Sequence, residues 1–261
     1  MKITKTLAAA LAAGLIFSAC QTEVEEPNFG EVDGFTLEAL AEAGFNTTEV
    51  VKVENGYIVE KDIFMTDNDI ANLAQGDHIS GEHYSTTNLV TGTPRTITVR
   101  TSISSFNAAL DEAIARYNAE SMTLTFQKVS SGADINIVAS PWYYRFFGIL
   151  GSAGFPTAGG DPFNQIQMTT SYYSGAPTNG IATVIAHEMG HCIGFRHTDY
   201  ADRSYSCGGA TDNEGDGGVG AVYIPGTPTG PSANSWMLAC GSPTGDRPFT
   251  SEDVTALTTL Y

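Results

Sequence analysis

Positive charge is scarce in this chain of 261 residues. It has 12 lysines and arginines against 29 aspartates and glutamates, which gives a formal net charge of −17. Such a surface repels polyanions, because binding to nucleic acid or to anionic lipid depends largely on Lys and Arg contacts to phosphate. The composition therefore excludes a nucleic-acid partner. Charged residues of both signs make up only 16%, which is typical of an exported protein with long polar loops.

A long hydrophobic run is also missing. The longest apolar stretch, residues 7–17, has eleven residues, which is too short to cross a bilayer. Because Lys2 and Lys5 precede it, this stretch is typical of a signal peptide. No other stretch is long enough for a transmembrane helix.

The signal peptide ends in Phe-Ser-Ala-Cys at residues 17–20, which resembles the lipobox of bacterial lipoproteins. We expect a lipoprotein signal peptide over residues 1–19, lipidation of Cys20, and an acidic tether over residues 20–34. The mature protein would then lie at the outer membrane or cell surface, with membrane contact only through the lipid anchor. The alternative is an ordinary signal peptide cut after Ala19, which would release a secreted protein.

Cysteine is rare as well, with four residues in the chain. Three of them lie beyond Cys20, so the mature chain forms one internal disulfide at most. We favour Cys207 with Cys240, because both belong to loop-rich segments whereas Cys192 belongs to a predicted helix. The alternatives are a bridge between Cys192 and Cys207, and a cysteine that ligates a metal.

Histidine is rare too, with five in the chain, but three of them stand in one pattern. Residues 187–197 read H-E-x-x-H-x-x-G-x-x-H. His187 and His191 are one helical turn apart, so their imidazoles leave the same face and form a chelate for Zn²⁺. Glu188 follows the first histidine and can act as a general base on water at the metal without ligating it.

The third histidine makes the pattern specific. A straight helix would carry His197 too far along its axis to share a metal with His191. Gly194 lies between them, and glycine tolerates the positive φ at which helices often end. The chain can therefore turn and bring His197 back as a third ligand. Three protein ligands leave one position for water, which is typical of a catalytic zinc site rather than a structural one.

At these residues the chain resembles the metzincin zinc peptidases, and it is most similar to the dual-action HEIGH metallopeptidases. The resemblance covers residues 90–261. It implies an α+β fold, with a twisted mixed sheet, two long helices and a loop-rich C-terminal half. It also implies one catalytic Zn²⁺ and a methionine turn at Met237, within residues 235–240. The astacins, a related group, have glutamate in place of Thr198 and tyrosine in place of Ala239, so we expect no tyrosine ligand.

The resemblance implies a zinc-dependent endopeptidase that acts on protein or peptide substrates. Its water would be activated by zinc and by Glu188. The alternative is a surface-anchored binding lipoprotein with a vestigial or structural metal site. The presence of Glu188 argues against this alternative, because a structural site needs no base.

We divide the mature chain at residue 90. Residues 35–90 form an N-terminal element and linker, and residues 91–261 form the metallopeptidase domain. In the element we predict a helix over residues 35–45 ended by Gly44, a hairpin around Asn55-Gly56, and a helix over residues 67–75 capped by Asp67. The element resembles the pro-segments of secreted peptidases, which lie over the cleft, and its Asp62 is the candidate carboxylate for the zinc. The alternative is a packing appendage without a regulatory role.

Residues 95–138 have the β-α-β-β order that the resemblance implies for the upper half of a metzincin domain. Alternating residues predict strands over residues 95–103, 122–126, 135–138 and 165–170. Apolar stripes predict helices over residues 105–119, 181–193 and 249–261, capped respectively by Ser104 or Ser105, Thr178 or Asn179, and Thr250 or Ser251. By the resemblance, residues 165–170 form the sheet edge that binds extended peptide by strand addition.

Two other groups of potential metal ligands are less specific. His78 and His83 lie in a polar linker, and we expect them to be solvated rather than ligating. Residues 211–218 combine carboxylates with glycines, which is compatible with a Ca²⁺ site. No glutamate closes the pattern of a complete EF-hand, so we favour a solvated acidic loop.

Overall fold

The computed structural model describes residues 30–43, 45–73, 83–214, 221–228 and 230–261. The predicted signal peptide, Cys20, most of the tether, Gly44 and His78 lie outside these residues. The strands are β1 (Val51–Val53), β2 (Gly56–Val59), β3 (Ile63–Met65), β4 (Tyr84–Ser85), β5 (Arg95–Thr101), β6 (Leu124–Lys128), β7 (Ile135–Ala139), β8 (Gly151–Ala153), β9 (Gln165–Met168) and β10 (Val222–Tyr223). The helices are α1 (Gly34–Glu42), α2 (Asp67–Asn72), α3 (Asn107–Asn118), α4 (Thr178–Cys192), α5 (Ser204–Cys207) and α6 (Ser251–Leu260), with short 3₁₀ turns η2 (Ser104–Phe106), η3 (Trp142–Phe146) and η4 (Thr170–Tyr173).

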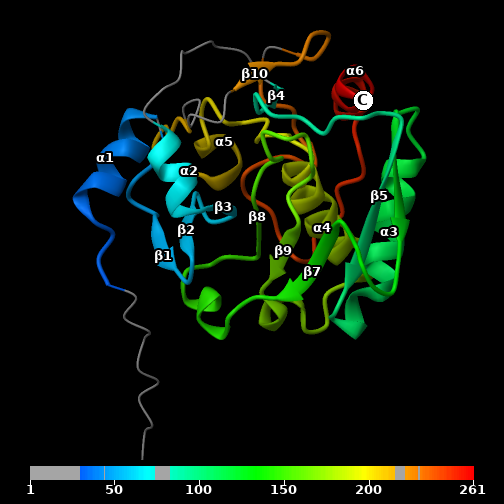
Figure 1. The fold of residues 1–261 in the computed structure, drawn as a ribbon, viewed down its shortest axis with the longest axis horizontal. Coiled ribbons are helices and arrows are strands. Elements are labelled where there is room, and N and C mark those ends of the chain that lie inside the picture. Colours follow the sequence, from blue (N-terminus) through cyan, green and yellow to red (C-terminus); the bar gives the residue numbers. More distant parts are fainter. Residues whose placement is uncertain (1–29, 44, 74–82, 215–220, 229) are drawn as a thin grey trace, which may run out of the picture.

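The main sheet has eight strands in the order β1-β2-β3-β8-β9-β7-β5-β6, and β4 pairs with β10 in a separate ribbon. Strands β5, β6, β7 and β9 are parallel, whereas β8 is antiparallel to β9. Figure 1 shows α3 and α4 in the part of the molecule that holds β5, β7 and β9, with α1 and α2 near β1–β3 at the other side. Mixed strands combined with helices confirm the predicted α+β class.

The predicted position of the sheet edge is wrong. Residues 165–168 form β9 as a strand, but β9 lies between β8 and β7 and has no free edge. Among the strands of residues 91–261 in the main sheet, β8 takes the outer position on this side instead, and β3 of the N-terminal element pairs with it. It has only three residues, Gly-Ser-Ala, whose small side chains give no apolar alternation, so the sequence did not indicate it.

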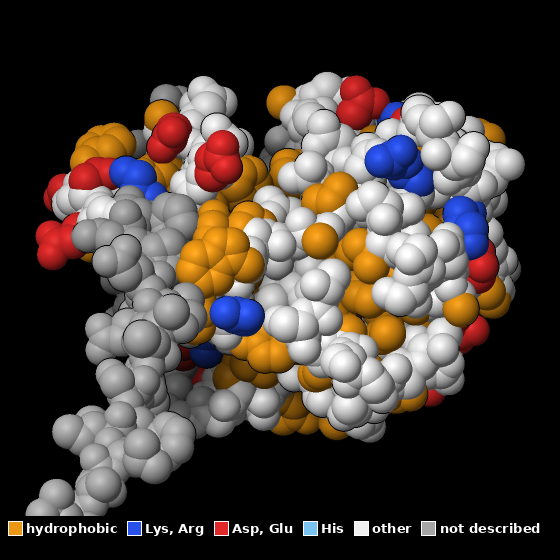
Figure 2. Space-filling model, turned by 90° about the horizontal axis from the view of Figure 1, so that it is seen from below, with side chains coloured by type: hydrophobic (Ala, Val, Ile, Leu, Met, Phe, Trp, Pro, Cys, Tyr) orange, Lys and Arg blue, Asp and Glu red, His pale blue; other side chains and the backbone are white. Residues whose placement is uncertain are grey.

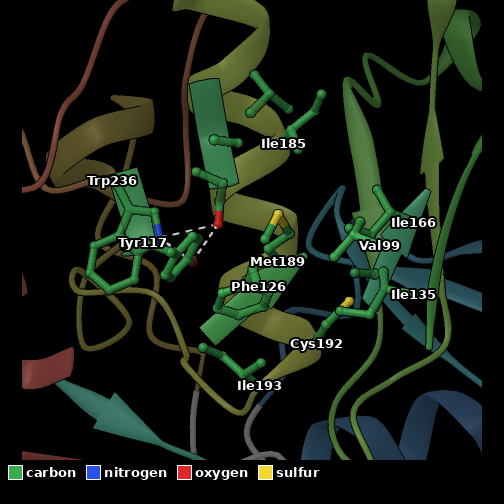
Figure 3. Packing of buried hydrophobic residues seen from close by; sticks show 14 of the residues in the cluster. Val99, Tyr117, Phe126, Ile135, Ile166, Ile185, Met189, Cys192, Ile193 and Trp236 are labelled. Carbon is green, nitrogen blue, oxygen red and sulfur yellow. Dashed lines mark hydrogen bonds between the residues drawn. The ribbon is translucent and has the colours of Figure 1, made fainter. Parts of the chain in front are cut away.

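The core forms between the sheet and the two long helices. Helix α3 buries one stripe, whereas α4 is buried from residue 180 to residue 192. Figure 3 shows one side of α4 facing the sheet and the other side facing two large aromatic residues, Tyr117 and Trp236. The Tyr117 hydroxyl donates to the carbonyl oxygen of Ala186 at 2.7 Å, and the Trp236 indole N–H donates to the same oxygen at 3.3 Å. A helix enclosed on all sides is a rigid support for a site.

The predicted side-chain caps of these two helices are wrong. Helix α3 is preceded by η2, which incorporates Ser104 and Ser105, and neither serine caps it. Helix α4 begins after Pro177 without a side-chain cap, although Thr178 and Asn179 lie in its first turn. For α6 the prediction is confirmed, because Thr250 caps it in a capping box with Asp253.

The N-terminal element has the predicted hairpin between two helices, with small shifts. The turn lies at Glu54-Asn55, so Gly56 begins β2 rather than occupying the turn. Helix α1 is capped by Asp33 and ends at Glu42. Helix α2 is capped by Thr66 and not by Asp67.

The element joins the main sheet through β3, which the sequence did not predict. Ile63 pairs with Ala153 in a parallel register, and the Ala153 N–H donates to the carbonyl oxygen of Asp62 at 2.9 Å. Strand β3 therefore occupies the outer edge of β8. Because this edge is filled from within the chain, the element and the metallopeptidase domain share one continuous sheet.

His83 is buried, so the expectation of a solvated side chain is wrong. It is 1% exposed, and its Nε2 lies 3.3 Å from the Oδ1 of Asp253 at the first turn of α6. His83 belongs to no group of potential metal ligands among the described residues. Its contact with α6 holds the end of the linker against the domain.

The surface seen in Figure 2 is mostly uncharged, with scattered hydrophobic patches. Acidic side chains gather at the left of that view, on the side where Figure 1 places α1 and β1. Within the described part of the chain, no helix combines the length and the apolar character that a membrane span requires.

Candidate metal centre

The first two histidines project from α4. Their Nε2 atoms lie 3.1 Å apart. The Nδ1 of His187 lies 2.8 Å from the carbonyl oxygen of Trp236, and the Nδ1 of His191 lies 2.9 Å from that of Phe195. Each ring is therefore fixed by a backbone contact on the side that faces away from the other histidine.

A tight turn ends α4 and reverses the chain. The helix ends at Cys192, and Gly194 has a φ of +103°, a conformation that favours glycine. The N–H of Phe195 donates to the carbonyl oxygen of Gly190 at 2.9 Å, which closes the turn. A Cβ on Gly194 would also lie 2.8 Å from the Cδ2 of Leu89. Glycine is thus required here for both conformation and space.

The segment after the turn carries His197 back to the helix. It is held on both sides, because the Arg196 N–H donates to the carbonyl oxygen of Tyr84 at 2.9 Å and the Thr198 N–H donates to that of Met237 at 2.8 Å. One ligand atom from each of His187, His191, His197 and Asp62 lies within 4.8 Å of the other three. The structure therefore brings together the three histidines of the motif and adds a carboxylate.

The hydrogen bonds of the rings show that this point suits a cation. Carbonyl oxygens only accept hydrogen bonds, so the Nδ1 atoms of His187 and His191 carry the protons. In the neutral rings each Nε2 then presents a lone pair, and the two lone pairs face each other across 3.1 Å. The Nε2 of His197 is buried without a hydrogen bond. A divalent ion satisfies all three nitrogens, and three imidazoles leave one corner of a zinc tetrahedron for another ligand.

The predicted methionine turn lies against α4 beneath the histidines. Met237 is fully buried, and a Cβ on Gly190 would lie only 2.5 Å from its sulfur. The absence of a side chain at Gly190 thus lets the methionine approach the helix. A disulfide joins Cys207 to Cys240 just after this turn, and Cys192 is a buried free thiol.

Glu214 is a residue of the site that the sequence did not indicate. Its Oε1 lies 2.6 Å from the Nδ1 of His197, and its side chain is fully buried. A carboxylate on the far nitrogen of a ligand histidine fixes its tautomer and orientation. The expectation of a solvated acidic loop is therefore wrong for Glu214, while residues 215–218 lie outside the described residues. The only signal in the sequence was an acidic residue shortly after the motif.

Two arginines and a second glutamate complete a buried network around Glu214. The Arg203 Nε lies 3.2 Å from the Glu214 Oε1, and Arg196 Nη2 lies 3.5 Å from its Oε2. Burial raises the pKa of Glu214, but the attraction of His197 and of the two arginines outweighs it, and the net pKa is lowered. Arg203 also donates to the backbone oxygen of Glu60 at 2.9 Å. Burial and then the charge of Glu214 hold the pKa of the Glu60 carboxyl well above its usual value.

Glu188 lies beside His187 at a cavity. Its side chain is buried, its Oε2 has no hydrogen-bond partner, and burial followed by the charge of Asp62 raises its pKa well above the usual value. Gly151 on β8 gives it room, because a Cβ there would lie 2.6 Å from the Glu188 Oε1. The adjoining cavity measures about 150 Å³ and is lined by Glu188, His187 and Leu238 among others. An unpartnered carboxylate with a raised pKa is suited to accept and return a proton.

Asp62 lies at the same point from the side of the N-terminal element. Its Oδ2 is 3.1 Å from the Nε2 of His197 and 3.6 Å from that of His187. Burial raises the pKa of Asp62, but the charge of His197 and the close contacts with both histidines outweigh it and hold the pKa far below its usual value. Asp62 thus stands where the fourth ligand of a tetrahedral ion would bind.

An α+β domain with three converging imidazoles and a glutamate that lines the adjoining cavity is typical of zinc-dependent hydrolases. Residues 57–261 match the dual-action HEIGH metallo-peptidase family. Because the match covers most of the chain, the protein belongs to this family and is a zinc metallopeptidase. The matched range includes β3 and Asp62. Among curated proteins, none has a significantly similar sequence.

Several solved structures resemble the fold in part. A structure of myroilysin has a TM-score of 0.42 and 12% identity, and the match covers 66% of this chain and 82% of that chain. A second, a crystal structure of myroilysin, has a TM-score of 0.40 and 13% identity, with 77% and 98% covered. The hatching-enzyme zinc protease HCE-1 of Oryzias latipes has a TM-score of 0.37 and 13% identity, with 63% and 88% covered.

Proposed function

We propose that the protein is a zinc-dependent endopeptidase that hydrolyses peptide bonds within protein substrates. The observation that carries this proposal is the convergence of His187, His191 and His197 beside the unpartnered carboxylate of Glu188. His187 and Glu188 line the cavity, and the ligand atoms of His191 and His197 lie within 4.8 Å of that of His187. A peptide carbonyl and a water molecule in the cavity can therefore reach both the base and an ion held by the three histidines. A structural zinc site would need no general base such as Glu188.

The three histidines would hold the ion, which supplies Lewis-acid activation of water and of the scissile carbonyl. Glu188 takes the proton from the attacking water and later delivers it to the leaving amine. Burial raises the pKa of the Glu188 carboxyl above its usual value. The carboxyl can therefore keep the proton from the water until the leaving amine takes it. Glu214 keeps the Nε2 of His197 directed at the ion through the contact at Nδ1.

We also propose that residues 35–90 include an inhibitory pro-segment. Strand addition along an outer edge is a common way to bind extended peptide, and β8 is the sheet edge beside Glu188. In this chain β3 fills that edge, and Asp62 reaches the metal centre. The described arrangement corresponds to a latent enzyme, and release of the element would free both the edge and the fourth ligand position.

We further propose that the enzyme is an exported lipoprotein anchored through Cys20, at the outer membrane or cell surface. Support comes from the sequence of residues 1–20 and from the disulfide between Cys207 and Cys240, because disulfides persist mainly in oxidising compartments. If Cys20 is not lipidated, the same chain would be secreted.

Cleavage of casein by the purified chain tests the proposed activity. The zinc-loaded protein is assayed before and after limited proteolysis of its N-terminal element. We expect cleavage that is abolished by a chelator and restored by Zn²⁺. The Glu188→Gln variant, treated identically, should bind zinc and lose activity by several orders of magnitude. Equal activity of this variant and the parent would overturn the proposal. Zinc binding with no cleavage by either would favour a binding protein with a structural metal site.

A further inference from the structure

The cavity beside Glu188 is lined in part by an arginine, Arg247, that has no role in the hydrolytic step. Its lining includes Val184 and His187 of α4 and several residues of the loop of residues 238–247. The walls are largely apolar, with Leu150 and Leu238 among the lining residues. Arg247 belongs to the same lining, and its guanidinium contacts the carbonyl oxygen of Cys240, another lining residue.

The backbone at Arg247 is held firmly in place. Its N–H donates to the Oγ1 of Thr183 at 2.9 Å, and its carbonyl oxygen accepts from Arg116 at 3.3 Å. The neighbouring Asp246 forms an ion pair with Arg116 at 2.9 Å. The Nη1 of Arg247 donates to the carbonyl oxygen of Cys240 at 3.1 Å, next to the disulfide. The side chain therefore has a defined position in the wall of the cavity.

The charge of Arg247 is not matched by a carboxylate. Among the described residues none lies within ion-pair distance of its guanidinium, whereas Arg95, Arg116 and Arg203 each pair with at least one acid. Asp199 attracts Arg247 only from longer range, and its carboxylate accepts hydrogen bonds from Ser206 and Ala239 instead. Arg247 is half-buried in a strongly acidic protein, yet no carboxylate of the described residues pairs with its guanidinium. Its positive charge can therefore attract an acidic group that enters the cavity.

We propose that this cavity receives the side chain of a substrate residue next to the scissile bond and that Arg247 selects an acidic one. The proposal rests on the peptidase function proposed above. The apolar walls accommodate the aliphatic stem of the side chain, and the guanidinium donates charge-assisted hydrogen bonds to its carboxylate. Glutamate fits this combination best, because it carries two methylene groups before its carboxylate.

The acids already present do not fill this role. Asp62 also lines the cavity, but its Oδ2 faces the histidines at 3.1 and 3.6 Å. Glu188 is beside His187 and serves the reaction. Lys61, the other lining cation, pairs with Glu49 at 2.7 Å and belongs to the N-terminal element. When that element is released, Arg247 is the cation that remains in the wall.

Matched peptide pairs test this inference. The zinc-loaded full-length chain, after limited proteolysis of its N-terminal element, is given peptides that differ only by Glu or Gln at one position flanking the cleaved bond. Cleavage sites are identified by mass spectrometry and kcat/KM is measured for each pair. At one flanking position we expect the Glu peptide to be preferred about tenfold, the effect of a hydrogen bond to a charged group worth roughly 1.5 kcal/mol.

Substitutions at Arg247 then distinguish a role in selecting the substrate side chain from a role in holding the loop of residues 238–247 in place. Arg247→Gln should bring the Glu-to-Gln ratio close to one, and Arg247→Glu should favour a Lys peptide over its Gln partner. The ratio does not depend on how much of the enzyme is folded. Lys128→Gln, at the far edge of the sheet on β6, is the matched control and should keep the preference of the parent.

Each outcome bears on a different claim. Cleavage of both peptides with a ratio near one at every flanking position would overturn the role of Arg247 and leave the proposed function standing. An equal loss of kcat/KM for both peptides in Arg247→Gln would show that Arg247 only supports the loop. If neither the parent nor Glu188→Gln cleaves any peptide, the proposed function fails and this inference fails with it.

Discussion

The Oδ2 of Asp62 lies 3.1 Å from the Nε2 of His197, although the two residues are 135 positions apart in the sequence. The two atoms are close without hydrogen-bond geometry, as expected of two ligands of one ion. Strand β3 leads directly away from Asp62 and pairs with β8. The carboxylate and the strand therefore belong to one continuous segment, which contacts the metal centre through Asp62 and covers the outer edge of β8 through β3.

Replacement of Asp62 should partly activate the intact chain. In Asp62→Ala the fourth ligand position is open to water while β3 stays in place, so we expect peptide cleavage several-fold above that of the intact parent. Asp67→Ala, which changes an exposed carboxylate on α2, should leave the low activity unchanged. After release of the N-terminal element, all three proteins should have equal activity. An intact parent that is already fully active would contradict the latent state.

Replacement of Glu214 should weaken zinc binding. In Glu214→Gln the contact to the Nδ1 of His197 loses its charge, and loss of such a partner typically costs 10–100-fold in metal affinity. Competition against a chromophoric chelator measures the affinity, and the absorption of the Co²⁺-substituted protein reports the ligand geometry. Glu38→Gln, which changes an exposed carboxylate on α1, serves as the control. Unchanged zinc affinity in Glu214→Gln would show that the carboxylate does not position His197.

Replacement of Gly194 should damage both stability and the metal centre. An alanine there must adopt φ of +103° and place its Cβ 2.8 Å from Leu89. Gly132→Ala is the matched control, because its φ is +65° and no atom lies within 4 Å of the added Cβ. We expect a loss of about 1 kcal/mol in the control from the left-handed conformation. Gly194→Ala should lose a further amount, about 1–3 kcal/mol, from overpacking.

Urea unfolding of the metal-free proteins measures both losses. Zinc content after reconstitution is the second readout, and it should fall in Gly194→Ala alone. Equal stability and equal zinc content in the two variants would mean that the turn after α4 tolerates a side chain.

Removal of the disulfide should destabilise the domain around the cavity. Cys207 and Cys240 are separated by 33 residues, and closing a loop of this length in the unfolded chain is worth about 3–4 kcal/mol on chain-entropy grounds. We expect Cys207→Ser combined with Cys240→Ser to lower the Tm by several degrees, and the parent under reducing conditions to behave like this variant. A Tm that does not respond to reduction would contradict a stabilising bridge.

The part of the site that the sequence predicts is the part whose geometry is local. His187 and His191 are one helical turn apart, and a glycine at positive φ brings His197 back to the helix. The spacing of these residues therefore predicts that the three histidine side chains converge. Asp62 was a candidate only through the resemblance of its segment to pro-segments. The cap of α6 was also predictable, because Thr250 and Asp253 are close in sequence and form one reciprocal motif.

The residues that the sequence missed depend on contacts between distant segments. In the sequence, Glu214 is one acidic residue in a polar loop, and nothing local distinguishes it from its neighbours. Only the folded chain places its carboxylate beside the Nδ1 of His197. His83 reads as solvated, yet α6 encloses it. Strand β8 has small side chains and no alternation, so its place between β3 and β9 follows from pairing with them rather than from its own composition.

X-ray absorption spectroscopy of the zinc-loaded chain tests the central claim most directly, namely that three imidazoles hold one catalytic ion. We expect one zinc per chain, with nitrogen and oxygen ligands at about 2.0–2.1 Å and the multiple-scattering features of three imidazoles. His197→Ala should lose one imidazole or lose the ion. A zinc–sulfur distance of about 2.3 Å, which would place Cys192 on the ion, or an unchanged spectrum in His197→Ala, would show that the three histidines do not hold the ion together.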